Sequence, residues 1–240
     1  MPDSGTIGKR GHATAECYAA DMTSAIDTFA NTFSPEAFRA QAGIGLHRHA
    51  PPSATFGGSD FDLNPELVAD ILAGTPPTPA AVLVPIVLRG DALTVLLTER
   101  TAHLKSHPGQ ISFPGGKIDP ADHDAVATAL REVHEEIGIE ARFIEPIGYL
   151  DGYRTGTGFQ IQPVVALVTP GFEIRPNPGE VADVFEVPLP FLMDVANHQR
   201  HSRFWNGRER HFYAMPYRDR FIWGATAGMI RNMHKRLYGS

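Results

Sequence analysis

Two apolar runs rich in β-branched residues, AVLVPIVL and ALTVLLTER, lie close together in the chain at 81–88 and 92–100. The polar tripeptide RGD at 89–91 separates them, and this arrangement predicts a β-hairpin. Apolar runs of the same kind predict further strands at 143–150, at 160–168 and around 185–187.

Apolar positions with helical spacing predict helices at 125–137, 190–196 and 225–237. In the first of these, four apolar residues form one stripe suited to a buried face: Val126, Leu130, Val133 and Ile137. Ser34 before Pro35 predicts the start of an earlier helix, and Asn64-Pro65 predicts a short one that ends at Gly74. Because strands and helices interleave without regular βαβ alternation, we expect an α/β fold with a mixed β-sheet packed between helices.

The composition is that of an ordinary globular protein. The chain has 240 residues, 42% of them hydrophobic, and a formal net charge of −6, which does not favour a nucleic-acid-binding surface. Its one cysteine, Cys17, excludes an internal disulfide and fits a reducing compartment. The longest apolar run, at 80–88, is too short to span a membrane, and the N-terminus lacks the apolar core of a signal peptide. We therefore expect a cytoplasmic protein without a nucleic-acid or membrane partner.

The first 33 residues differ from the rest because they are small and polar and have no sustained period. This texture predicts a disordered tail, followed by a single domain over 34–240 with an N-terminal helical extension and a closing C-terminal helix. Translation could start at Met1 or at Met22, and the sequence favours neither a monomer nor a homodimer.

Three glutamates, Glu132, Glu135 and Glu136, fall within an arc of roughly 100° on the helix predicted at 125–137. Like charges four residues apart repel each other on a helix, and no lysine stands four residues downstream to relieve them. The ordinary interpretation of such a cluster is a solvated acidic face.

The residues before this helix favour a cation site instead. The segment FPGGK at 113–117 has two adjacent glycines, which allow close approach of the backbone or a positive φ. The segment DPADHD at 119–124 adds three more acids, although aspartates at this position also cap helices. A pocket of carboxylate oxygens suits hard cations such as Mg²⁺ or Mn²⁺ rather than zinc.

The segment from 112 to 139 resembles the Nudix box, G-x5-E-x7-R-E-U-x-E-E-x-G-U, in which U is aliphatic. Its right half matches fully: Arg131, Glu132, Val133, Glu135, Glu136, Gly138 and Ile139. The left half departs, because Gly116 lies one residue too early and the first acid is Asp122 or Asp124 rather than a glutamate in register. The resemblance implies a Nudix fold, a mixed β-sheet in an α/β/α sandwich, and a divalent-metal-dependent diphosphatase.

The preceding segment, LLTERTAHLKSHPGQISFPGG at 96–116, is similar to the signature of the coenzyme A diphosphatase branch, L-L-T-x-R-[S/A]-x3-R-x3-G-x3-F-P-G-G. Two positions differ, because Thr101 replaces Ser/Ala and Lys105 replaces Arg, which keeps the charge but loses the planar fork. The resemblance implies cleavage of coenzyme A or acyl-coenzyme A to 3′,5′-ADP and (acyl-)4′-phosphopantetheine. The alternatives are another diphosphate such as ADP-ribose or NADH, and a binding module that has lost catalysis.

The two resemblances imply the roles of the site residues. Metal ligands would be Glu132 and Glu136, with Glu135 as a ligand or an orienting group and the Gly115 carbonyl as a further candidate. Arg131 would orient a box glutamate by charge-assisted hydrogen bonds. Substrate contacts would come from the branch signature: Arg100, Lys105, Gly109 and Phe113. The general base would be a box glutamate or Glu180, whose other interpretation is a turn residue in the loop NPGE.

Overall fold

The computed structural model describes residues 32–52, 59, 62–67, 76–104, 107–205 and 207–239. The tail predicted at 1–33 lies outside these ranges except for Thr32 and Phe33. Phe33 is buried, and its ring centroid lies 5.1 Å from that of Tyr238 near the C-terminus. This residue was assigned to the tail from its polar surroundings, but its aromatic contact makes it part of the folded domain.

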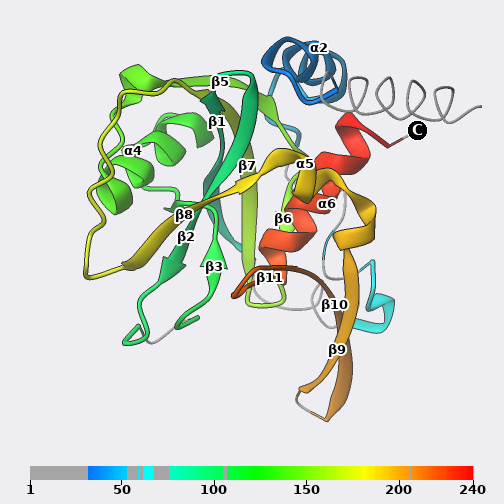
Figure 1. Ribbon diagram of the computed structural model, residues 1–240. Coiled ribbons are helices and arrows are strands. Elements are labelled where there is room, and N and C mark those ends of the chain that lie inside the picture. The colour runs from blue at the N-terminus through cyan, green and yellow to red at the C-terminus, as the bar shows by residue number, and fades with distance from the viewer. Residues whose placement is uncertain are drawn as a thin grey trace, which may run out of the picture.

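A central sheet of eight strands organises the chain (Figure 1). Its strands are β1 (Thr78–Arg89), β2 (Ala92–Arg100), β3 (Ile111–Ser112), β4 (Gly115–Lys117), β5 (Ile144–Tyr149), β6 (Tyr153–Arg154), β7 (Phe159–Val168) and β8 (Val181–Pro188). The order is β3-β2-β1-β7-β5, and β4 also pairs with β1, β6 with β7, and β8 with β2. β1 and β2 form the predicted antiparallel hairpin, whereas β1 and β7 are parallel. The prediction of a mixed sheet is therefore confirmed.

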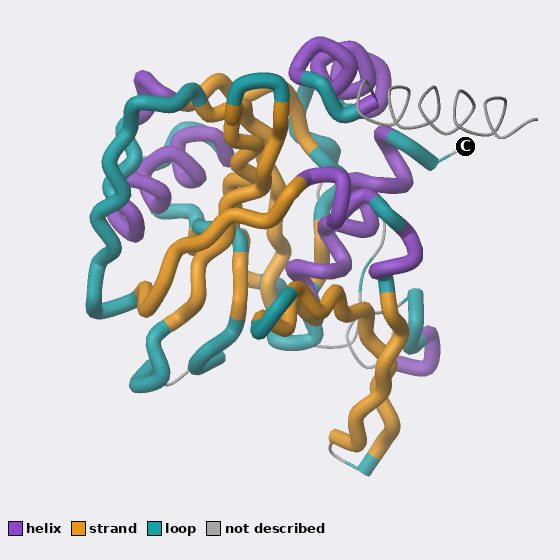
Figure 2. Tube along the Cα trace, viewed as in Figure 1, coloured by secondary structure: helices purple, strands orange, loops and turns teal. Residues whose placement is uncertain are grey.

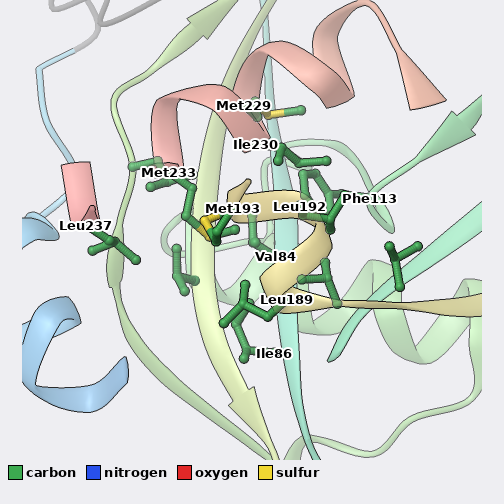
Figure 3. Packing of buried hydrophobic residues seen from close by; sticks show 14 of the residues in the cluster. Val84, Ile86, Phe113, Leu189, Leu192, Met193, Met229, Ile230, Met233 and Leu237 are labelled. Carbon is green, nitrogen blue, oxygen red and sulfur yellow. The ribbon is translucent and has the colours of Figure 1, made fainter. Parts of the chain in front are cut away.

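Helices cover both faces of this sheet, as the figures show (Figures 1 and 2). Side chains along β1 alternate between two cores: Leu83 packs with Val133 of α4 (Ala125–Ile137). Val84 and Ile86 pack with α5 (Leu189–Met193) and α6 (Ala225–Leu237) on the opposite face (Figure 3). This alternation follows from the two-residue period of a strand. It confirms the predicted α/β/α arrangement of layers.

Shorter elements complete the domain. α2 (Pro35–Gly45) starts as predicted, because the N–H of Ala37 donates to the Ser34 hydroxyl over 3.2 Å. The 3-10 turns are η1 (Pro65–Leu67), η2 (Ala141–Phe143) and η3 (Val195–Asn197). The residues after η1, where the predicted second helix was to end at Gly74, lie outside the described ranges. Within those ranges no helix is long and apolar enough to cross a membrane.

A second, three-stranded sheet joins the domain near its C-terminus and was not predicted. It consists of β9 (Gln199–Trp205), β10 (Arg208–Tyr217) and β11 (Arg220–Trp223) in the order β11-β10-β9. Figure 1 shows β9 and β10 as a hairpin that extends from the body of the molecule. Polar residues dominate β9 and the first half of β10, so the longest apolar run in these strands is the short one at 212–215.

The helix predicted at 190–196 is divided in the structure. The backbone N–H of Asp194 donates to the Pro190 carbonyl and closes α5, while the Asp194 carboxylate accepts from the N–H of Ala196 over 2.9 Å and starts η3. The aspartate thus acts as a helix cap in the middle of the predicted segment. The helices predicted at 125–137 and 225–237 have the predicted bounds.

Candidate active site

The acidic helix α4 is fixed at both ends. At its start the Asp124 carboxylate accepts a hydrogen bond from the N–H of Ala127 over 2.8 Å. At its end Gly138 has a φ of 76° in the left-handed region, where glycine is favoured, and its N–H donates to the His134 carbonyl. Ala129, Val133 and Ile137 bury one face of the helix against the sheet. The glutamates therefore project from a rigid helix.

Arg131 lies at the centre of a carboxylate network. Its Nε and Nη2 donate to the two oxygens of Asp122 over 3.2 and 2.9 Å. Its Nη1 donates to Glu132 over 2.9 Å and to Glu135 over 3.0 Å. Hydrogen bonds from this guanidinium hold the pKa of the Asp122 carboxyl far below its usual range. One arginine thus contacts three carboxylates, and its orienting role stays a prediction.

The network distinguishes the two aspartates that the sequence left as alternatives. Asp122 binds Arg131, and it also accepts from the Thr128 hydroxyl over 2.8 Å and from the N–H of Asp119 over 3.0 Å. Asp124 instead caps the helix. Asp122 stands six residues after Gly116, so the spacing G-x5-acid is kept and the extra residue of the box lies between Asp122 and Arg131.

Glu136 is the most deeply buried acid of the cluster, with 4% of its surface exposed. Its carboxylate accepts a hydrogen bond from the N–H of Gly115 over 3.2 Å. Burial raises the pKa of Glu136 to about 8, and the charges of Glu132 and Glu180 add to that increase. Burial also raises the pKa of Glu132, although Arg131 opposes the increase. Both glutamates are in an environment that a cation would relieve.

The two adjacent glycines allow the backbone to approach these acids. A Cβ on Gly116 would lie 2.4 Å from Oε1 of Glu132, so any side chain there would displace the carboxylate. Gly115 has a φ of 155°, and a Cβ there would lie 2.4 Å from the Ala81 carbonyl oxygen of β1. Each glycine is thus required for a different reason, Gly116 by an acid and Gly115 by the sheet.

A divalent cation fits the chemistry of this site, since its donors are all carboxylate oxygens. In the described part of the chain, however, no three carboxylate, imidazole or thiol side chains already converge as a metal site. Arg131 holds Glu132 and Glu135, while the Gly115 N–H holds Glu136. Arg131 donates to Oε1 of Glu132, so Oε2 could bind a cation without loss of this hydrogen bond. The part of the Gly115 carbonyl in such a site stays a prediction.

Glu180 lies on the loop between β7 and β8, and this loop contacts the C-terminal end of α4. The N–H of Asn177 donates to the Glu136 carbonyl over 2.8 Å, and the N–H of Arg175 donates to the Ile137 carbonyl over 2.8 Å. The Glu180 carbonyl in turn accepts from the N–H of Thr101. These backbone hydrogen bonds hold the exposed Glu180 close enough for its negative charge to raise the pKa of both Glu132 and Glu136. The structure thus brings the predicted loop acid to the glutamates.

Part of the segment at 96–116 lies close to the same glutamates. Arg100 ends β2, and its charge opposes the increase in the pKa of Glu136. Gly109 has a φ of 67° and donates its N–H to the Arg100 carbonyl over 3.1 Å, which closes the loop. Lys105, predicted to contact the substrate, lies outside the described residues. Phe113 was predicted to do the same, but its side chain is 2% exposed in the larger core (Figure 3), so its role is packing.

Arg220 of β11 makes contacts with β2 and β8 that the sequence did not suggest. It donates to Glu99 of β2 and, over 2.6 Å, to Asp183 of β8, and it lies 4.7 Å from the Phe185 ring centroid. These contacts join the second sheet to the strand that ends in Arg100. Sequence reasoning missed these contacts because it predicted no strands at 199–223.

Comparisons with known proteins agree with the geometry. A family model described as NUDIX domain matches residues 77–206. A protein named Uncharacterized Nudix hydrolase NudL from Enterobacter sp. (strain 638) is 38% identical over 171 residues, which cover 71% of this chain and 87% of that protein. Its namesake from Yersinia enterocolitica is 40% identical over 158 residues, 66% of this chain and 80% of that protein. A solved structure, the NUDIX domain of Shewanella oneidensis NrtR complexed with ADP ribose, is 25% identical at a TM-score of 0.38, with 52% of this chain and 82% of that chain covered.

Proposed function

Because the chain belongs to the Nudix hydrolase family, we propose that it cleaves the diphosphate of coenzyme A or acyl-coenzyme A with the help of Mg²⁺ or Mn²⁺. Hydrolysis adds one water across the P–O–P linkage. The products would be 3′,5′-ADP and 4′-phosphopantetheine or its acyl form.

The observation that supports this substrate is the position of the branch signature against the acidic helix. Its glycine pair contacts the glutamates, with the Gly115 N–H on Glu136 and the Gly116 backbone against Glu132. Arg100, from the same signature, is close enough to Glu136 to influence its pKa. A positive side chain beside a metal-binding carboxylate is suited to one phosphate of a diphosphate.

In this proposal Glu132 and Glu136 hold the cation, and Glu135 holds it or orients its ligands. A bound divalent ion neutralises the diphosphate and supplies a water that is readily deprotonated. Arg131 keeps Glu132 and Glu135 in place through the hydrogen bonds described above. The charge of the substrate would be balanced further by Arg100 and Lys105.

The proton of the attacking water goes to a carboxylate, and Glu180 and Glu135 are the two candidates. Glu180 is exposed on a loop whose backbone is tied to both α4 and the end of β2. Glu135 is shared with Arg131, which makes its carboxylate less available as a base. We therefore favour Glu180 as the general base. Glu180→Gln should lower kcat with little effect on KM, and an unchanged kcat would transfer this role to Glu135.

The substrate is tested by incubating the protein and Mg²⁺ or Mn²⁺ with coenzyme A, an acyl-coenzyme A, dephospho-coenzyme A, ADP-ribose and NADH. Products are identified by mass. We expect kcat/KM to be highest for coenzyme A or its acyl form, with 3′,5′-ADP as a product. A higher kcat/KM for ADP-ribose or NADH would refute the substrate, and no turnover of any diphosphate would indicate a binding module. Location in the cytoplasm and a homodimer stay predictions.

A further inference from the structure

A polar strip lies on the sheet beside the candidate active site. Gly116 of β4 is the register partner of Ala81 of β1, which in turn is the partner of Gln162 of β7. Ala81 packs in the core under α4, and Gly116 faces Glu132, so this row of the sheet faces α4. Since side chains alternate along a strand, Gln160 lies on the same face as Gln162. The partner of Gln160 on β6 is Arg154, which extends the strip to the neighbouring strand.

Arg210 of β10 approaches the end of this strip from the second sheet. Its Nη1 lies 3.5 Å from the point where a Cβ on Gly156 would stand, and Gly156 belongs to the turn that joins Arg154 to Phe159. Two arginines, one from each sheet, therefore flank the same turn. The turn and β10 come from segments far apart in the chain, and Arg210 is the contact between them.

Two buried polar atoms here have no hydrogen-bond partner among the described residues: Nε of Arg210 and Oε1 of Gln160. No ion pair within the described ranges includes Arg210. Burying a charged donor without an acceptor is unfavourable. A ligand that brings anionic oxygens to Arg210 would remove this cost.

The position of the strip suits a group remote from the reacting diphosphate. Lys117, Ala80, Ile161 and Tyr153 are successive register partners on β4, β1, β7 and β6. At about 4.8 Å per strand, three steps place β6 roughly 14 Å from β4. Arginine side chains extend over only part of that span, so their guanidinium groups would meet a part of the substrate beyond its diphosphate.

We propose that Arg210 and Arg154 form a subsite for the phosphate on the ribose 3′-oxygen of the substrate. This proposal rests on the function proposed above, since coenzyme A carries such a phosphate and ADP-ribose and NADH do not. Guanidinium groups suit a phosphomonoester because they donate in a planar fork. The subsite would distinguish coenzyme A from dephospho-coenzyme A by contacts outside the metal-binding helix.

The test measures binding separately from hydrolysis. Isothermal titration calorimetry compares 3′,5′-ADP with 5′-AMP, which lacks only the 3′-phosphate, on the wild-type protein and on R210Q. Arg200→Gln is the matched control, because Arg200 pairs with Tyr213 while Arg210 pairs with Arg203. Tyr213 and Arg210 are three residues apart on β10, so their side chains lie on opposite faces of the hairpin. Arg200 shares the face of its partner Tyr213 and therefore faces away from Arg210.

We expect the wild-type protein to prefer 3′,5′-ADP by roughly ten- to a hundredfold, the range for hydrogen bonds to charged groups. R210Q should lose most of this preference and R200Q should keep it. R154Q provides a second removal of charge, with thermal unfolding as the check that each variant is folded. Equal binding of the two nucleotides by the wild-type protein, or a preference retained in both R210Q and R154Q, would overturn the subsite.

The two proposals fail in different ways. Hydrolysis of coenzyme A without any preference for 3′,5′-ADP would leave the proposed function and remove the subsite. A clear preference for 3′,5′-ADP that depends on Arg210, without hydrolysis of coenzyme A, would keep the subsite and remove the proposed reaction.

Discussion

Replacing Gly116 by alanine tests whether the position of one carboxylate controls activity. Gly116 is in β4 and its φ lies outside the left-handed region, so its backbone accepts an alanine. The added Cβ would stand 2.4 Å from Oε1, 2.5 Å from Cδ and 2.7 Å from Oε2 of Glu132. The substitution therefore acts on the end of one side chain and leaves the sheet pairing intact.

The expected displacement follows from these distances. Ordinary van der Waals contact begins at 3.4 Å, so Oε1 of Glu132 has to move by about 1 Å, the difference between 3.4 and 2.4 Å. A shift of that size away from Arg131 would break the 2.9 Å hydrogen bond from its Nη1. Misplacement of a reacting or ligating group by about 1 Å can reduce the rate about a hundredfold. We expect a decrease in kcat/KM of that order for G116A.

The assay combines steady-state hydrolysis of the preferred diphosphate at saturating Mg²⁺ with thermal unfolding of the same samples. G116A should unfold close to the wild-type temperature, because a flexible carboxylate end can move at little cost. The control is Gly43→Ala in α2, where a Cβ would meet nothing within 4 Å. G43A should keep full activity and gain roughly 0.5–1 kcal/mol in the free energy of unfolding. Wild-type kcat/KM in a folded G116A would refute the role given to Glu132.

Three further predictions concern other parts of the site. Without divalent cations the free energy of unfolding should fall as pH rises from about 5 to about 8, since Glu136 with its pKa of about 8 binds its proton more tightly in the folded state. Urea unfolding in EDTA should show that Glu136→Gln flattens this dependence, while kcat falls by orders of magnitude; normal turnover would exclude Glu136 as a ligand. Asp122→Asn should lower kcat/KM by loosening Arg131, and its stability deficit should shrink as pH falls below 3.8, because the pKa of the wild-type carboxyl is lowered in the fold. A constant deficit would contradict the ion pair. Lys105→Ala should weaken kcat/KM for coenzyme A by roughly 1–3 kcal/mol and Lys105→Arg should not; an unaffected Lys105→Ala would show that the lysine has no substrate role.

The elements that the sequence predicted well are those in which one local signal decides the structure. The bounds of α4 follow from Asp124 as a cap, an apolar stripe and Gly138 as a terminator. The β1–β2 hairpin follows from two apolar runs around a short polar turn. The second sheet could not be predicted in this way, because β9 and the first half of β10 are mostly polar and become strands through pairing within the sheet. Its contacts are tertiary and leave little trace in hydrophobic periodicity.

The site residues also differ in whether local spacing or tertiary contacts determine their positions. Spacing on a helix was enough to group Glu132, Glu135 and Glu136, since their positions on α4 follow from a fixed angle per residue. Spacing could not choose between Asp122 and Asp124, because that choice depends on how the loop returns to Arg131. Phe113 was misassigned for a related reason, since a motif position does not reveal whether its side chain points to solvent or to the core.

The arrangement of the acids also explains how the cluster tolerates its own repulsion. Asp122, Glu132 and Glu135 share the guanidinium of Arg131, so one positive charge offsets part of their mutual repulsion. Glu136 has no such partner among the described residues; its one hydrogen bond comes from the neutral N–H of Gly115, and its raised pKa keeps it largely protonated near neutral pH. A divalent cation would therefore act mainly at Glu136, where it takes the place of a proton, and secondarily at Glu132, whose Oε2 is not engaged by Arg131. Arg131 can then keep its hydrogen bonds to Asp122, Glu132 and Glu135 when the ion binds.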